Sequence, residues 1–125
     1  FADTPVMRLS GGQRQRVWLA MALAQGTKVL LLDEITTYLD IYYQLQLLRL
    51  ARELNEKHKI TIMMVMHDIN QAMAYSHDVV VMKKRKILTS GSAQEVINSD
   101  LLHEAFGVNA KLTVLDGHPY CIYEP

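Results

Sequence analysis

Two short apolar runs that each end in chemically active side chains constrain this chain more than any other feature. The run 29–32 is continuously apolar, and the run 60–66 follows a similar pattern. Runs of this length are typical of parallel strands that are covered on both faces. Asp33 and Glu34 follow the first run, and His67 follows the second. Open α/β sheets place ligands beyond the carboxyl ends of their strands, so we expect function at this edge.

The segments around these two strands have helical patterns. Residues 13–25 follow a Ser-Gly-Gly turn in which Ser10 is the expected N-cap, and Gly26 should end this helix. Its residues 17–24 are apolar all round, which predicts a mostly buried helix. A second helix over 42–58 has one apolar stripe, formed by Leu47, Leu50, Ala51 and Leu54. With strands over 28–33 and 60–66, the pattern predicts an α/β fold with a parallel sheet core.

The C-terminal part is predicted to hold shorter elements. A brief helix should span 68–75, and strands 79–82 and 87–89 should flank the basic turn 83–86, with Gly91 ending that hairpin. We expect this turn to be solvated. Ser92 and Ser99 are the expected N-caps of two short helices. The tail, 111–123, should hold two strand-like pieces around a Gly117-His118-Pro119 turn.

Composition excludes several classes of function. The 125 residues carry 13 basic and 13 acidic side chains, so no electrostatic footprint for nucleic acid or an anionic membrane is present. The single cysteine, Cys121, is expected to be a buried thiol on a strand. No apolar run is long enough to span a bilayer, so a membrane role requires a partner. The chain begins at Phe1 without a signal peptide, and we expect it to be a fragment or a processed product.

The Ser10-Gly11-Gly12-Gln13 turn is the first candidate site. A helix start offers unpaired N–H groups and a positive dipole end, and two glycines allow a phosphate to approach the backbone closely. The same residues also suit a simple helix cap. Taken alone, the turn leaves both interpretations open.

The strand ends supply the second and third candidates. Adjacent strand residues point in opposite directions, so one of Asp33 and Glu34 could serve a metal while the other orients water, or both acids could simply be solvated. His67 could contact a phosphate or hold a nucleophile, and the alternative is a structural histidine. A metal site at His67-Asp68 lacks further ligands at useful spacing.

The order and spacing of these segments resemble the ABC ATPase family. The strings LSGGQRQRV, LLLDE and TTYLD, followed by a strand that ends in HD, cover essentially the whole chain. The resemblance implies that the Ser10–Gln13 turn contacts the γ-phosphate of ATP held by the opposite subunit. It also implies that Asp33 serves Mg²⁺ largely through water and that Glu34 polarises the attacking water. By the same resemblance, His67 reaches the γ-phosphate and Asp40 closes a loop across the dimer interface.

The resemblance also implies partners and a location. The segment Thr36–Ile41 looks like the subgroup that powers import of ferric siderophores, haem or cobalamin, and Met21 and the tail around Phe106-Gly107-Val108 fit it. The implied protein is an ATPase that pairs with a second ABC subunit, with a homodimer expected. It would bind transmembrane permease subunits and lie peripherally on the cytoplasmic face of the cell membrane. The transported substrate is chosen by other subunits.

Some family features are altered or missing. Ile35 stands where the family usually has Pro, which predicts a looser loop, and Arg85 stands where the hairpin usually has Gly, which predicts another turn geometry. No GxxxxGK[ST] phosphate cradle (Walker A) and no glutamine loop occur in the 125 residues. We therefore expect residues 1–125 to be a partial nucleotide-binding domain that cannot hold or hydrolyse ATP alone. Its sheet should expose apolar surface and promote self-association.

Two other functions fit parts of this pattern. A soluble ABC ATPase that acts on DNA or ribosomes would share the same signature turn and acidic strand. A non-catalytic interaction module would have no need of Glu34 and His67, and both are present. The importer subunit is therefore the leading hypothesis.

Overall fold

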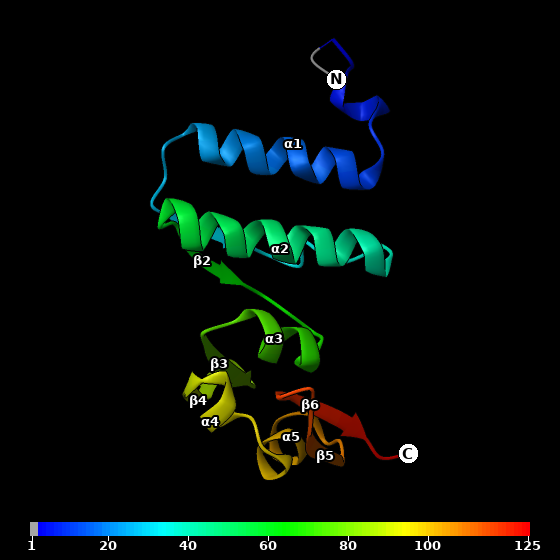
Figure 1. Cartoon of the computed structure of the whole chain (residues 1–125), viewed down its shortest axis with the longest axis vertical. Coiled ribbons are helices and arrows are strands. Elements are labelled where there is room, and N and C mark those ends of the chain that lie inside the picture. Colours follow the sequence, from blue (N-terminus) through cyan, green and yellow to red (C-terminus); the bar gives the residue numbers. More distant parts are fainter. Residues whose placement is uncertain (1–2) are drawn as a thin grey trace. The chain divides into compact units, whose positions relative to one another are not determined.

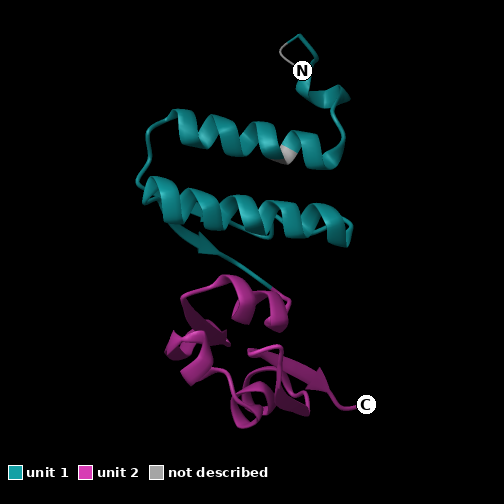
Figure 2. Ribbon diagram, viewed as in Figure 1, with its two compact units in different colours: residues 1–66 teal, residues 67–125 magenta. Residues whose placement is uncertain are grey.

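The computed structural model describes residues 3–125, apart from the side chain of Gln15. The chain forms two compact units, residues 1–66 and 67–125 (Figure 2). None of the helices that the described residues form is long and apolar enough to cross a membrane.

The first unit is built around a parallel strand–helix–strand motif. Its elements are η1 (Val6–Arg8), α1 (Gly11–Ala24), β1 (Val29–Leu32), α2 (Ile41–His58) and β2 (Thr61–Met64). Strands β1 and β2 pair in parallel from Val29↔Thr61 to Leu32↔Met64, with α2 as the connection between them. Helices α1 and α2 lie side by side (Figure 1). This arrangement confirms the predicted α/β fold with a parallel core.

Apolar packing on one face of this sheet holds the first unit together. The buried cluster takes one residue from α1, one from β1 and two from α2: Leu19, Leu30, Leu47 and Leu54. Leu48 is fully buried, and Leu50 of the predicted stripe packs at the margin of the cluster. The helical pattern of α2 thus identified its buried face correctly.

The other face of the sheet is exposed. This contradicts the expectation that strands of this type are covered on both faces, and it confirms the expectation that the sheet of a partial domain exposes apolar surface. Leu31 and Met63 are 70% and 64% exposed, and Val29 and Val65 are exposed beside them. The prediction of a mostly buried α1 is also wrong, because Trp18 and Met21 are exposed. The reason is the same in each case: the described residues of this unit form one layer of helices on one side of a two-stranded sheet.

The second unit combines two antiparallel hairpins with short helices. Its elements are α3 (Ile69–Tyr75), β3 (Asp78–Lys83), β4 (Lys86–Ser92), α4 (Ala93–Val96), α5 (Ser99–Phe106), β5 (Ala110–Leu115) and β6 (His118–Tyr123). Strand β3 pairs with β4, and β5 pairs with β6. One buried apolar cluster joins these helices and hairpins. Its members are Met73, Ala93, Ile97, Leu102, Ala110 and Cys121. The predicted burial of the Cys121 thiol on a strand is confirmed, and burial raises the pKa of this thiol.

Three details of the second unit differ from the sequence prediction. Asn98, not Ser99, is the N-cap of α5, because its side chain accepts a hydrogen bond from the Leu101 N–H. Gly91 lies within β4 instead of ending it. It has φ 152°, and a Cβ there would lie 2.9 Å from Val96 Cγ2. The last hairpin turns earlier than predicted, at Asp116-Gly117, because both residues have the positive φ of a tight two-residue turn.

The basic hairpin turn keeps a tight geometry without glycine. Lys83 pairs with Lys86, and the two residues between them, Lys84 and Arg85, have φ values of 48° and 64°. Positive φ at both central residues is the pattern of a type I′ turn, which normally uses Asn or Gly. Arg85 therefore occupies a strained backbone conformation, and the turn itself is solvent exposed as predicted.

This strain makes Arg85→Gly a stabilising substitution. The left-handed conformation costs a side-chain-bearing residue about 1–2 kcal/mol, and the greater freedom of glycine in the unfolded chain offsets part of that. We expect the free energy of unfolding to rise by about 0.5–1 kcal/mol, measured by urea denaturation. Arg85→Ala is the matched control and should give no gain. An equal gain in both variants would mean that removal of the charge, and not relief of strain, is responsible.

The exposed sheet face predicts that the 125-residue chain self-associates. Exposed apolar patches and open strand edges favour pairing with another chain, and the zero formal net charge offers little electrostatic resistance. Leu31→Thr combined with Met63→Thr should shift the chain toward monomer in size exclusion with light scattering. Phe106→Ser removes an exposed apolar side chain from the second unit and serves as the control. A wild-type chain that is monomeric at high concentration would contradict the prediction.

Candidate functional site

The Ser10–Gln13 turn forms a complete capping box at the start of α1. The Gln13 N–H donates to Ser10 Oγ over 3.3 Å, and the Ser10 N–H donates to Gln13 Oε1 over 3.0 Å. The Arg14 guanidinium also donates to the Leu9 carbonyl just before the turn, over 3.3 Å. These bonds hold the turn in one conformation, so the predicted N-cap at Ser10 is confirmed.

The capped turn still has donors for an anion. The N–H groups of Gly11 and Gly12 occupy the first helical positions, where the helix supplies no acceptor. Ser10 Oγ accepts from Gln13 and keeps its own hydroxyl proton to donate. Ser10 is exposed, and a Cβ added at Gly11 would meet nothing within 4 Å. The turn is therefore a helix cap whose remaining donors are still available to an anion.

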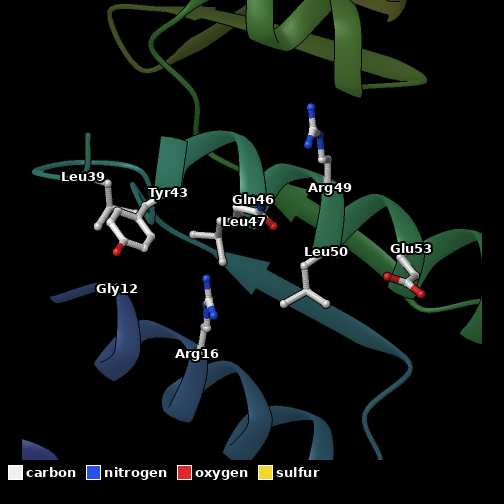
Figure 3. Close-up of a pocket in the computed structure, with 9 residues that line it drawn as sticks. All are labelled: Gly12, Arg16, Leu39, Tyr43, Gln46, Leu47, Arg49, Leu50 and Glu53. Carbon is white, nitrogen blue, oxygen red and sulfur yellow. The ribbon is translucent and has the colours of Figure 1, made fainter. Parts of the chain in front are cut away.

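The turn borders a groove between α1 and α2 (Figure 3). The groove has a volume of about 280 Å³, with Arg16 on the α1 side and Arg49 and Glu53 on the α2 side. At its end near the turn, a Cβ at Gly12 would lie 3.4 Å from the Tyr43 ring. The Tyr43 side chain of α2 therefore lies beside Gly12 at this end of the groove.

Tyr43 connects the turn to Asp40, the other residue of the first unit that was predicted at the dimer interface. Asp40 is the N-cap of α2, and its Oδ1 accepts from the Tyr43 N–H over 3.1 Å. The Tyr43 ring then packs beside Gly12. The structure therefore brings the Ser10–Gln13 turn and Asp40 together across one side chain. The sequence analysis did not identify Tyr43; its spacing of three residues from a capping Asp40 was the available signal.

Asp33 and Glu34 lie directly after β1, and both are exposed. The pairing of the two strands continues past β2, because the Val65 N–H donates to the Leu32 carbonyl over 3.0 Å. Glu34 has a left-handed backbone with φ 50°, and its carbonyl accepts from the Thr37 N–H over 3.1 Å. Such strain in a residue with a side chain is commonest at functional sites. The tight turn after β1 thus sets the direction of the Glu34 backbone.

The loop from Glu34 to Asp40 is attached to the core by its apolar residues. Ile35 and Leu39 pack against the buried cluster of the first unit, and the Leu39 carbonyl accepts from the Gln44 side chain over 2.8 Å. Between them Tyr38 is fully exposed and has φ 64°. Packing of Ile35 therefore supplies an attachment at the position where the family usually has proline.

His67 begins the second unit, whereas all other predicted site residues belong to the first. It is exposed and lies just before α3, whose N-cap is Asp68. The Asp68 carboxylate accepts from the Gln71 N–H over 2.9 Å. Asp68 therefore has a capping role at the start of α3.

The side chains that could bind a metal are not grouped together in the part of the chain that the structure describes. Residues 3–125 contain no group of three or more His, Cys, Asp or Glu side chains placed to hold a metal ion. Mg²⁺ in nucleotide sites keeps several waters and takes one or two carboxylates plus phosphate oxygens. An exposed Asp33 carboxylate suits that limited role, with the nucleotide and water supplying most ligands.

Comparisons with known proteins identify a family and relatives for this chain. The family described as ABC transporter matches residues 1–37. The iron(3+)-hydroxamate import ATP-binding protein FhuC of Bacillus subtilis (strain 168) is 50% identical over 112 residues, which is 90% of this chain and 42% of that protein.

Two solved structures have the same fold. A metal-chelate type ABC transporter in an inward-facing conformation aligns with a TM-score of 0.84 and 27% identity, over 96% of this chain and 49% of that one. A dimeric ATP-binding cassette bound to ADP and phosphate aligns with a TM-score of 0.65 and 33% identity, over 74% of this chain and 40% of that one.

The chain spans less than half the length of each of these three proteins. Over that span, the capped Ser-Gly-Gly turn, the acidic end of β1 and the strand before His67 follow each other as the family resemblance predicted. The chain belongs to the ATP-binding family of ABC transporters.

Proposed function

We propose that this chain is part of the ATP-hydrolysing subunit of an ABC importer for a ferric siderophore or a related iron chelate. The observation that supports this most strongly is the position of the Tyr43 ring beside Gly12, which brings the capped Ser10–Gln13 turn next to the Asp40 cap of α2. The name of the Bacillus subtilis relative favours an importer over a soluble ATPase that acts on DNA or ribosomes.

Each site residue has a proposed role in hydrolysis. The Ser10 hydroxyl and the Gly11 and Gly12 N–H groups would donate to the γ-phosphate of ATP held by an opposite subunit, with Gln13 bracing the turn. The Glu34 carboxylate would polarise the attacking water, and the His67 ring would contact the γ-phosphate. Asp33 would hold Mg²⁺ through water, and this ion would supply positive charge to the phosphates.

The proposed partners follow from the same geometry. A turn that binds phosphate in trans requires a second ABC subunit, and we propose a homodimer, in line with the dimeric cassette bound to ADP and phosphate. Permease subunits would attach this dimer to the cytoplasmic face of the membrane as a peripheral component. Residues 1–125 would form the C-terminal part of each nucleotide-binding domain and would receive the Walker A phosphate cradle and the glutamine loop from outside these residues.

The proposed hydrolytic role predicts the behaviour of Glu34→Gln. The test uses a hybrid protein, in which this chain replaces the matching segment of the Bacillus subtilis iron(3+)-hydroxamate import ATP-binding protein. Glutamine keeps the shape of the side chain and loses the charge that polarises water, so turnover should fall by about 10²–10⁴-fold while ATP binding persists. Phosphate release and nucleotide titration measure the two properties. Near-normal turnover would assign the catalytic role to another residue.

The proposed action in trans predicts a different phenotype for Ser10→Arg. The bulky side chain would fill the space of the γ-phosphate, so the hybrid monomer should bind nucleotide normally but fail to dimerise with ATP. Light scattering measures the dimer. Mixing this variant with one that lacks the phosphate-cradle lysine should restore one composite site and some dimer. Loss of nucleotide binding by the monomer would mean that the turn acts in cis, and unchanged dimerisation would reduce it to a helix cap.

A further inference from the structure

The Asn70 side chain of α3 makes two hydrogen bonds to the backbone of Cys121 in β6, and we call this pair of bonds the clasp. Its Nδ2 donates to the Cys121 carbonyl over 3.1 Å, and its Oδ1 accepts from the Cys121 N–H over 2.7 Å. An amide that satisfies both backbone groups of one residue acts like a short piece of neighbouring strand. The clasp therefore joins α3 directly to β6, across 51 positions of sequence.

Apolar packing supports the clasp from the same helix. Met73 is buried in one cluster with Cys121 and Leu102, and Ile69 packs against that cluster. Asp68, at the start of α3, also interacts electrostatically with Tyr123, at the end of β6. Burial raises the pKa of the Tyr123 phenol first, with the Cys121 thiol and then the Asp68 carboxylate adding to the shift. Helix α3 is thus held on β6 along its first turns.

The clasp lies very near the predicted catalytic histidine. Only two residues separate Asn70 from His67, so the His67 Cα lies within about 11 Å of the Asn70 Cα, and anchoring Asn70 limits where His67 can lie. One of the two, Asp68, is the N-cap that fixes the first turn of α3 through the Gln71 N–H. His67 is exposed and directly precedes this cap.

We propose that Asn70 is a positioning residue for His67, and that it acts by anchoring the start of α3 to strand β6. This inference rests on the proposed function, because it assumes that His67 contacts phosphate during hydrolysis. The β5–β6 hairpin then contributes to hydrolysis through the clasp. A movement of this hairpin would be transmitted to His67.

Hydrogen exchange in the 125-residue chain tests whether the clasp holds the helix. Asn70→Ala should increase exchange at the Cys121 N–H and at the amides of α3. Asn70→Asp keeps an acceptor for the Cys121 N–H and loses the donor to its carbonyl, so it should have an intermediate effect. The matched control, Asn98→Ala, removes the cap bond to Leu101 in the same unit, and its effect should stay within α5. Unchanged exchange at α3 in Asn70→Ala would overturn the proposal.

Turnover of the hybrid protein tests whether the clasp positions His67. Asn70→Ala should lower kcat by about tenfold to a hundredfold, as small misplacements of catalytic groups do, with KM for ATP within twofold. Asn70→Ala in a His67→Ala background should cause no further loss of kcat, because Asn70 is proposed to act only through the contact of His67 with phosphate. Asn98→Ala should leave turnover unchanged.

The two failures can be told apart. An equal loss of kcat in the presence and absence of the His67 side chain would indicate general destabilisation and overturn the positioning role. A rise in KM as large as the fall in kcat would also overturn it. Normal turnover in Glu34→Gln would instead reject the assignment of the catalytic carboxylate in the proposed function, while the exchange experiment would still decide whether Asn70 anchors α3.

Discussion

Burial of leucine side chains on one face of the β1–β2 sheet is the interaction on which the first unit depends. Leu30 of β1 meets Leu19 of α1 and Leu47 of α2, and this contact fixes both helices relative to the strand. Once these elements are fixed, Asp33 and Glu34 must lie at the carboxyl end of β1. The starts of α1 and α2 come together at Gly12 and Tyr43. The candidate site is therefore a consequence of how the core packs.

The helix caps of this chain coincide with its predicted functional segments. Ser10, Asp40 and Asp68 each cap a helix through a side-chain oxygen that accepts from the third helical residue. A cap orients the chain where it enters a helix, and it leaves the remaining N–H groups directed outward. Each of these caps adjoins a predicted functional segment. A capping role and a functional role are therefore compatible at these positions.

Sequence reasoning succeeded where a short-range rule decides the structure. The Ser10 cap, the buried stripe of α2 and the parallel order of the two strands all follow from local spacing of side chains. It failed where packing against distant parts of the chain decides which of two adjacent residues caps a helix or forms a turn. Asn98 caps α5 instead of Ser99, and the last hairpin turns at Asp116-Gly117, because strand register and the position of α5 decide which residue meets which backbone group.

The sequence alone determined the family, the fold class and the identity of the candidate side chains, because these depend on the order of residue types along the chain. The tertiary structure alone decided which face of the sheet the helices cover and which distant residues meet. Leu31 and Met63 have the composition of buried strand residues and yet are exposed, since only one layer of helices packs on their sheet. The contacts of Tyr43 with Gly12 and of Asn70 with Cys121 likewise exist only after folding, because burial and hydrogen bonding act between elements that no sequence period connects.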